Sequence, residues 1–373
     1  PFAGDSLSID AGGRLLGKIG NNSANNTAVG TIQVASLILN GGAVDQAGAN
    51  SDNSVLIVAG NVSVTANSFL GALGATANNN SKFEMVEFTA PISGSAGLQV
   101  SGPGINGGQD TGNIRLSAAN PYSGTITVSN GVNNVIASAA NRMLPLNNLN
   151  ALANATLNLD AAQANPVSFA SGVNSGTFNV GALAGRSPQT LLDSAGAVVT
   201  LSVGGNNAST TYAGGLTDGG NLIKVGTGTL TLTGTNTYTG TTAVSAGALQ
   251  LGNGGVGGLL SPSSALTVDG NLIFNRNNTA VQGVDFTSSA ITGAGSLTQA
   301  GSGTTILNVA NSYSGATLVN AGKLVISSAQ VGTGAITVAD GAKLGVTVSG
   351  GSQFAPSALT LGTSGTTTLE FDG

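Results

Sequence analysis

Carboxylates are the main candidates for catalytic or metal-binding side chains in this sequence, because two of the usual catalytic residue types are missing. The 373 residues include 15 Asp and Glu and 10 Lys and Arg, but no His and no Cys. Without His there is no Ser–His–Asp triad and no imidazole metal site, and without Cys there is no disulfide and no thiolate metal site. Acid–base or metal chemistry would therefore require clustered carboxylates, as in enzymes that cleave polysaccharides.

Two pairs of carboxylates are close in sequence. Glu84 lies near Glu87, and Glu370 lies near Asp372. On a strand, Glu370 and Asp372 would share a face, like two ligands of one ion. A solvated strand end is the favoured interpretation, because the other acids are dispersed. We therefore predict no catalytic residue, no metal site and no cofactor, and we expect that the protein is not an enzyme.

Three other patterns resemble binding sites. Residues 102–107 match G-x-G-x-x-G, but no strand–helix context surrounds them, so nucleotide binding is not expected. Asp218, Asp269 and Asp340 each precede a Gly, and we expect their side chains to bond nearby backbone amides in turns. The Phe and Tyr residues would suit carbohydrate platforms, but their regular placement favours stacking in a core.

Composition indicates many short strands and tight turns. Charged residues make up 7% of the chain and hydrophobic residues 40%, and there are 59 Gly. This hydrophobicity with a net charge of −5 disfavours a disordered chain, and the scarcity of Glu, Lys and Arg disfavours exposed helices. The scattered basic residues argue against nucleic acid or an anionic membrane as a partner. No apolar run approaches the ~20 residues of a membrane span.

One motif recurs three times in the same register, with copies that begin at Asn120, Asn236 and Asn311. The Tyr and Gly positions that we assign as structural positions of the repeat are Tyr122, Gly124, Gly131, Tyr238, Gly240, Gly247, Tyr313, Gly315 and Gly322. With their flanks the copies define repeat modules at about 88–160, 212–275 and 286–348. Their unequal spacing predicts inserted loops between strands.

Strands of this kind must stack to be stable. In residues 228–234, Leu230 and Leu232 alternate with Thr, so one face of the strand is apolar. Stacking on the next coil buries that face and pairs the backbone. We predict an all-β fold, a single continuous right-handed parallel β-helix (β-solenoid) over residues 1–373, with roughly 20–25 residues in each of about 16 coils. A propeller or a sandwich is less favoured, because a propeller repeats at near-constant length.

The run from Leu222 to Leu251 resembles the autotransporter-associated β-strand repeat, G-x-G-x-L-x-L-x-G-x-N-x-Y-x-G-x-T-x-V-x-x-G-x-L. Residues 301–326 are similar but have Thr305 where Leu is usual, and residues 112–131 match in part, with Arg115 in the first strand. The resemblance implies a β-helical passenger region of a bacterial type V secreted or giant surface protein. It also implies an extracellular or bacterial-surface location.

These features favour a structural function. Neither end of the sequence carries a polar capping repeat, so we expect copies to stack end to end into a homo-oligomer or homopolymer that forms a fibre, stalk or surface layer. One alternative is an adhesin that binds a glycan or another cell-surface ligand on host, surface or sister cells. A glycan-active enzyme is the least favoured alternative.

Overall fold

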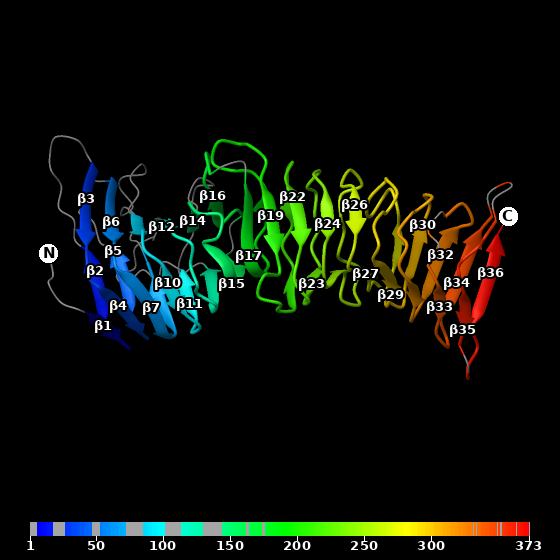
Figure 1. Ribbon diagram of the computed structural model, residues 1–373, viewed down its shortest axis with the longest axis horizontal. Helices are drawn as coiled ribbons and strands as arrows, with labels where there is room; N and C mark the ends of the chain where they lie inside the picture. Colours follow the sequence, from blue (N-terminus) through cyan, green and yellow to red (C-terminus); the bar gives the residue numbers. More distant parts are fainter. Residues whose placement is uncertain are drawn as a thin grey trace. The chain divides into compact units, whose positions relative to one another are not determined.

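The computed structural model describes residues 6–17, 27–46, 53–71, 85–100, 113–129, 144–161, 164–173, 176–330, 332, 334–348, 350, 353–362 and 364–372. The chain forms two compact units, Pro1–Val199 and Thr200–Gly373. The described residues contain strands and turns, and none of them forms a helix with the length and hydropathy needed to span a membrane. Figure 1 shows the strands of each unit following one another in sequence order.

Three parallel sheets make up the first unit. The strands of the first sheet are β1 (Leu7–Asp10), β4 (Ser36–Asn40), β7 (Asn61–Ala66) and β10 (Ile92–Gly94). Those of the second are β2 (Arg14–Gly17), β5 (Ala43–Gln46), β8 (Ser68–Leu70), β11 (Leu98–Val100), β13 (Thr125–Ser129), β15 (Leu152–Asp160) and β17 (Thr177–Gly185). Those of the third are β3 (Thr27–Ile32), β6 (Asn53–Val58), β9 (Met85–Phe88), β12 (Asn113–Leu116), β14 (Leu144–Leu146) and β16 (Val167–Phe169). The short strand β18 (Gln189–Thr190) follows them.

The second unit also consists of parallel ladders. One ladder contains β19 (Thr200–Val203), β22 (Asn221–Lys224), β24 (Thr242–Val244) and β26 (Leu266–Val268). Another contains β20 (Thr210–Tyr212), β23 (Thr229–Leu232), β25 (Ala248–Leu251), β27 (Asn271–Phe274), β29 (Ser296–Gln299), β31 (Thr317–Val319), β33 (Ile336–Val338) and β35 (Leu359–Leu361). The third contains β28 (Thr279–Val281), β30 (Thr304–Leu307), β32 (Lys323–Ser327), β34 (Lys343–Thr347) and β36 (Thr368–Asp372), while β21 (Leu216–Thr217) is a two-residue strand.

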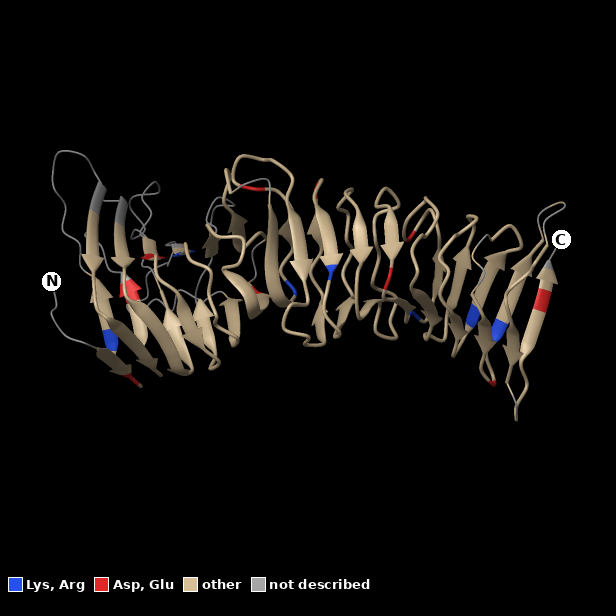
Figure 2. Ribbon diagram, in the orientation of Figure 1, with Lys and Arg blue, Asp and Glu red and all other residues tan. Residues whose placement is uncertain are grey.

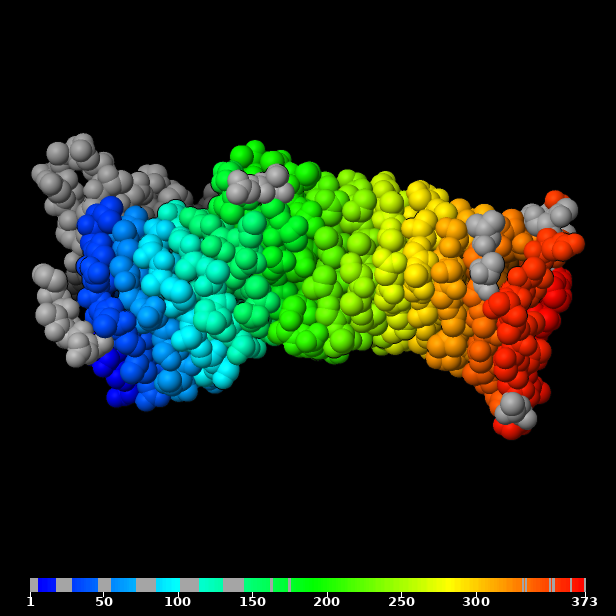
Figure 3. All heavy atoms as spheres, in the orientation of Figure 1, coloured from blue at the N-terminus to red at the C-terminus, as the bar shows by residue number. Residues whose placement is uncertain are grey.

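Within each ladder, an inner strand thus pairs with the strand one coil before it and the strand one coil after it, which is the pairing of a parallel β-helix. Crossover connections are what allow parallel strands to be neighbours, and here each connection is the rest of one coil. In the space-filling view the coils of each unit form consecutive bands in sequence order (Figure 3). The predicted β-helix is therefore confirmed, whereas a single continuous solenoid over residues 1–373 stays a prediction.

Alternation along the strands builds the core. Leu230 and Leu232 are buried as expected, and burial of each such side chain stabilises the fold by about 1.5–3 kcal/mol. Thr231, which alternation places on the outer face, is also buried, with 8% exposure. The neighbouring coils cover it, because Thr211 and Gln250 are its partners in register on either side.

Coil length differs between the units. In the second unit, hydrogen bonds between adjacent coils join residues 20 apart, as from Thr241 N to Asn221 Oδ1, or 25 apart, as from Ala294 N to Asp269 Oδ1. In the first unit the corresponding bond from Gly97 N to Asn67 Oδ1 joins residues 30 apart. The length expected from the sequence therefore fits the second unit, while the coils around Asn67 and Asn120 in the first unit are longer. The last coil of the first unit has the expected length, because Thr190 N donates to Asn165 Oδ1 25 residues earlier. Several of the segments expected to be inserted loops in the first unit lie outside the described residues.

Candidate functional site

The asparagine of each repeat copy joins consecutive coils. Asn120, Asn236 and Asn311 are buried, and each Oδ1 accepts a hydrogen bond from a backbone N–H of the preceding coil. The donors are Ile92 at 2.7 Å, Leu216 at 3.0 Å and Ile291 at 2.7 Å. Asn120 and Asn236 also donate to the following coil, to the carbonyls of Ala151 at 2.8 Å and Leu259 at 2.9 Å. These side chains thus satisfy buried backbone groups, which would otherwise be costly.

The tyrosines of the repeat lie in the same interior. Tyr238 and Tyr313 are buried, and each hydroxyl shares a hydrogen bond with the threonine four residues later, Thr242 at 2.5 Å and Thr317 at 2.7 Å. In the first copy this position is Ile126, and the Tyr122 hydroxyl donates instead to the backbone carbonyls of Ala96 and Thr125.

Burial also affects the chemistry of these hydroxyls. It raises the pKa of all four tyrosines of the chain, including the buried Tyr212, above the ordinary value. The burial of the tyrosines agrees with their expected position in the core, whereas the same expectation for the phenylalanines is wrong at Phe69 and Phe371, which are 40% and 58% exposed.

Close approach of coils explains the glycines that follow each tyrosine. A Cβ atom at Gly240 would collide with the carbonyl oxygen of Gly220, and one at Gly315 with that of Gly295. The corresponding Gly124 lies against the carbonyl oxygen of Ala96 in the same way.

The later glycines of the motif have a different requirement. Gly247 and Gly322 have φ of +61° and +59°, in the left-handed region that favours glycine. Gly131, the equivalent position of the first copy, lies outside the described residues.

A buried lysine beside the second copy was not expected from the sequence. Lys224 ends β22 with 1% exposure, and its ammonium donates to the carbonyls of the next two residues at 2.6 and 2.9 Å and to that of Ala246 in the next coil at 3.4 Å. Burial lowers the pKa of this ammonium. Gln299 occupies the equivalent position of the third copy and donates to the carbonyls of Gly301 at 2.8 Å and Gly303 at 3.2 Å. Alignment of the repeat copies places Lys224 and Gln299 at the same position, and this is the sequence signal that could have revealed a buried donor there.

Glu370 forms an ion pair with a lysine. Its Oε2 lies 2.5 Å from Lys323 Nζ, two coils earlier, and this bond and charge lower the pKa of the carboxyl. Gly345 lies between them, where a Cβ atom would be 3.1 Å from Lys323 Cε, so the absence of a side chain leaves room for the lysine to cross β34. The side chain of Asp372 and all of Glu84 lie outside the described residues, whereas Glu87 pairs with Arg115 at 3.4 Å.

Asp269 and Asp340 bond backbone amides as expected, but these amides belong to the next coil. Asp269 Oδ1 accepts from Ala294 N at 3.0 Å, and Asp340 Oδ2 accepts from Ser364 N at 3.2 Å and Ser364 Oγ at 2.8 Å. In each case the donor lies in the next coil, because turns of successive coils stack. Asp218 does occupy a turn, with φ of +74°.

No metal site is seen in the described part of the chain. Its residues include no group of three Asp or Glu that could hold a metal ion, and Figure 2 shows the charged residues scattered over the strands. The glycine motif at 102–107 lies outside the described residues.

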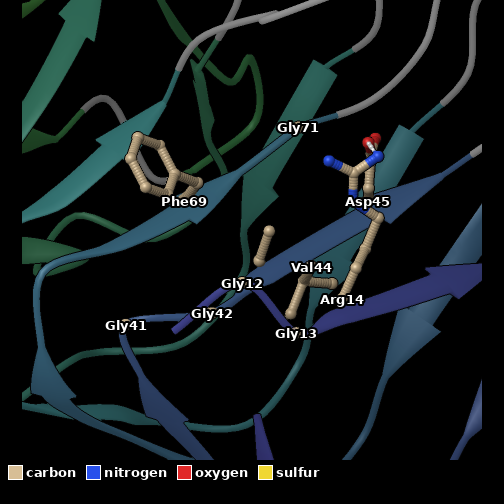
Figure 4. Close-up of a pocket in the computed structure, with 10 residues that line it drawn as sticks. Gly12, Gly13, Arg14, Gly41, Gly42, Val44, Asp45, Phe69 and Gly71 are labelled. Carbon is tan, nitrogen blue, oxygen red and sulfur yellow. Dashed lines mark ion pairs between the residues drawn. The ribbon is translucent and has the colours of Figure 1, made fainter. Parts of the chain in front are cut away.

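An open hollow lies on the second sheet of the first unit (Figure 4). It has a volume of about 310 Å³, and Phe69, 40% exposed, stands on one side of it. Arg14 and Asp45, joined by an ion pair of 3.6 Å, stand on the other side. The glycines between them are Gly12, Gly13, Gly41, Gly42 and Gly71.

A second hollow adjoins the first at Phe69. It has a volume of about 380 Å³ and runs over β8, β11 and β13 to Asp160 on β15. Most of its lining residues have polar side chains, and Gln99 Nε2 donates to Ser129 Oγ across it at 3.2 Å. Asp160 forms an ion pair of 2.7 Å with Arg186. Sequence reasoning missed both hollows.

The comparison with known protein families identifies the repeat. Residues 109–132, 222–251 and 297–326 match the family described as Passenger-associated-transport-repeat. These segments contain the asparagine, tyrosine and glycine positions described above. No curated protein and no solved structure gave a match to the chain. Three segments of the chain therefore match the passenger-associated-transport repeat, and they lie on a parallel β-helix.

Proposed function

We propose that the chain is a non-catalytic structural segment of an autotransporter passenger, displayed outside the cell or on the bacterial surface. The observation that supports this most directly is the use of the buried polar side chains. Asn236, Asn311 and Lys224 each bond the backbone of their own or a neighbouring coil. These three buried polar side chains of the second unit thus bond backbone groups within and between coils.

The carboxylates support the same proposal. A general acid needs a carboxyl whose pKa is raised towards neutrality. Glu370 and Asp340 have pKa values that are lowered, the first by Lys323 and the second by the hydroxyl and backbone of the next coil. Asp45, beside the first hollow, is paired with Arg14. This arrangement favours a scaffold over a glycan-cleaving enzyme.

End-to-end association of copies stays a prediction. Phe371 on β36 is 58% exposed. Either a second copy of the chain or a further coil of a longer chain would cover β36, so the exposure of Phe371 is no argument for association of copies.

Surface display can be tested by epitope insertion. The turn 252–258 is suitable, because Gly254 and Gly255 have open space around them and Val256 is 64% exposed. We expect an antibody to label intact bacteria that express the full reading frame with the epitope at this turn. A cytoplasmic protein with the same epitope is the control for cell integrity. Labelling only after permeabilisation would contradict the proposed location.

The absence of catalysis needs its own measurement. The purified chain is incubated with a panel of plant, fungal and bacterial polysaccharides, and new reducing ends are measured. We expect no release above the level of a heat-denatured sample. Release that is lost on heating would overturn the non-catalytic part of the proposal.

A further inference from the structure

We infer that the outer face of the second sheet of the first unit binds an uncharged carbohydrate chain, with Phe69 as the ring on which a sugar stacks. The inference goes beyond the structural function proposed above and does not depend on it. It starts from the two hollows of about 310 and 380 Å³, both of which are lined by this residue; Figure 4 shows the first of them.

The strand β8 directs Phe69 outward. Its neighbours Ser68 and Leu70 are buried, so alternation places the ring on the outer face. In register it lies between Ala43 on β5 and Gln99 on β11. Ala43 is too small to cover the ring on its side. A lone exposed aromatic residue is ordinary on a protein surface, but this one stands where two hollows meet.

The glycines beside the ring leave the backbone open. Five residues of the first hollow are glycines, and the neighbour of Phe69 in register on that side is Ala43, whose side chain is a single methyl group (Figure 4). A flat ligand can then lie against the strands while one face contacts the ring. A sugar ring suits this shape, because its C–H groups form an apolar face and aromatic rings offer an apolar surface for packing.

The other hollow supplies polar groups in a row. Gln99 and Thr127 follow Phe69 in register on the next two strands, with Ser129 beside them. Strands are about 4.8 Å apart, so these groups form a ladder across the sheet. Amides and hydroxyls both donate and accept hydrogen bonds. The hydroxyl groups of a sugar need this mixture.

Charge selects an uncharged ligand. Asp45 is paired with Arg14 at 3.6 Å, and Asp160 with Arg186 at 2.7 Å, so the acids at the two ends of the surface are each neutralised. An anionic polymer would need unpaired positive charge, which these pairs do not provide.

A protein partner fits the surface less well. Among the residues that line the two hollows, Phe69 is the exposed large hydrophobic side chain, and glycine and polar residues make up most of the rest. The apolar centre of a protein interface is larger than one ring.

Affinity electrophoresis of the full chain tests the inference. The gels contain soluble β-glucan, galactomannan, dextran or pullulan as neutral probes, and alginate or hyaluronan as anionic probes. We expect at least one neutral polysaccharide to retard the chain. Phe69→Ala should weaken that binding about tenfold, while Phe69→Trp should retain it, because stacking on an aromatic ring contributes on the order of this factor. Gln99→Ala should weaken it by a smaller factor.

Phe371→Ala is the matched control, because it removes an exposed phenylalanine of the second unit. It should leave retardation unchanged, and circular dichroism checks that every variant keeps its strands. Failure of every neutral probe, retardation by the anionic probes alone, or unchanged binding by Phe69→Ala would each overturn the inference. These outcomes leave the proposed display and the absence of catalysis untouched, since those are read from intact cells and from reducing ends.

Discussion

In the second unit, the bonds of Asn236 and Asn221 between coils join residues as few as 20 apart, whereas the bonds of Asn120 in the first unit join residues 28 and 31 apart. Both units contain the bridging asparagine, at Asn236 and Asn311 in one and Asn120 in the other. The exposed ring of Phe69 and both hollows belong to the first unit. The repeat therefore sets how coils are joined, while departures from its regularity give the chain its surface features.

The largest expected difference between the units is their response to alkaline pH. Tyr212, Tyr238 and Tyr313 lie in the second unit and Tyr122 in the first, and burial raises the pKa of each above the ordinary value near 10. Above pH 10 a tyrosine ionises in the unfolded chain before it ionises in the folded chain. The stability that comes from its raised pKa is therefore fully present below pH 10 and is lost as the pH rises towards the pKa of the folded state. Each tyrosine contributes a slope of about 1.4 kcal/mol per pH unit, so the second unit should lose stability about three times as steeply.

Hydrogen exchange read by mass spectrometry above pH 10.5 resolves the two units. Lys224 does not disturb this comparison. Because its pKa is lowered in the folded chain, its contribution makes the free energy of unfolding rise with pH, but only up to pH 10.5, the ordinary pKa of lysine. Tyrosinate absorbance should appear together with loss of structure, since the chain has no other tyrosine and no tryptophan. Ionisation of the tyrosines at pH 10 in a folded chain would contradict the burial argument.

The next effect is loss of the asparagine bridge. Asn311→Leu removes the acceptor of Ile291 N and two bonds with Gln282, all of them buried. Because buried groups left unpaired cost about 1–3 kcal/mol each, we expect the free energy of unfolding to fall by about 3 kcal/mol in denaturant titration. Asn253→Leu, at an exposed position of the same unit, is the control and should change it by less than about 0.5 kcal/mol. Equal effects of the two variants would show that the bridge does not stabilise the coils.

Much of the fold was predictable from the sequence because its signals are local. Alternation of Leu230 and Leu232 with threonine gives strands, and the spacing of Asn, Tyr and Gly gives the stacked coils. The bonds of Asp269 and the surroundings of Phe69 were not predictable, because they depend on residues one coil away. The distance in sequence to that neighbour changes with every loop, so no fixed spacing reveals it.

A smaller loss should follow from a methyl group between coils. Gly315→Ala places a Cβ atom against the carbonyl oxygen of Gly295, and the coils must shift apart. Overpacking of this kind costs about 1–3 kcal/mol. Gly255→Ala is matched, because the nearest atom to its Cβ would be 3.8 Å away. We expect thermal unfolding to separate the two variants, and a Gly315→Ala chain as stable as Gly255→Ala would mean that the coils are not held at close contact.

The smallest effect should be at the buried lysine, where the copies of the repeat differ. Lys224 and Gln299 both donate to the carbonyl two residues later, so Lys224→Gln should retain most of the free energy of unfolding. Lys224→Met keeps the length of the side chain but leaves the carbonyls of two adjacent residues and of Ala246 without this donor. Removal of the buried charge offsets part of that cost, so we expect a loss of about 1 kcal/mol relative to Lys224→Gln. If Lys224→Met and Lys224→Gln have the same free energy of unfolding in denaturant titration, the side chain at this position acts by filling space. The repeat would then tolerate any long residue there.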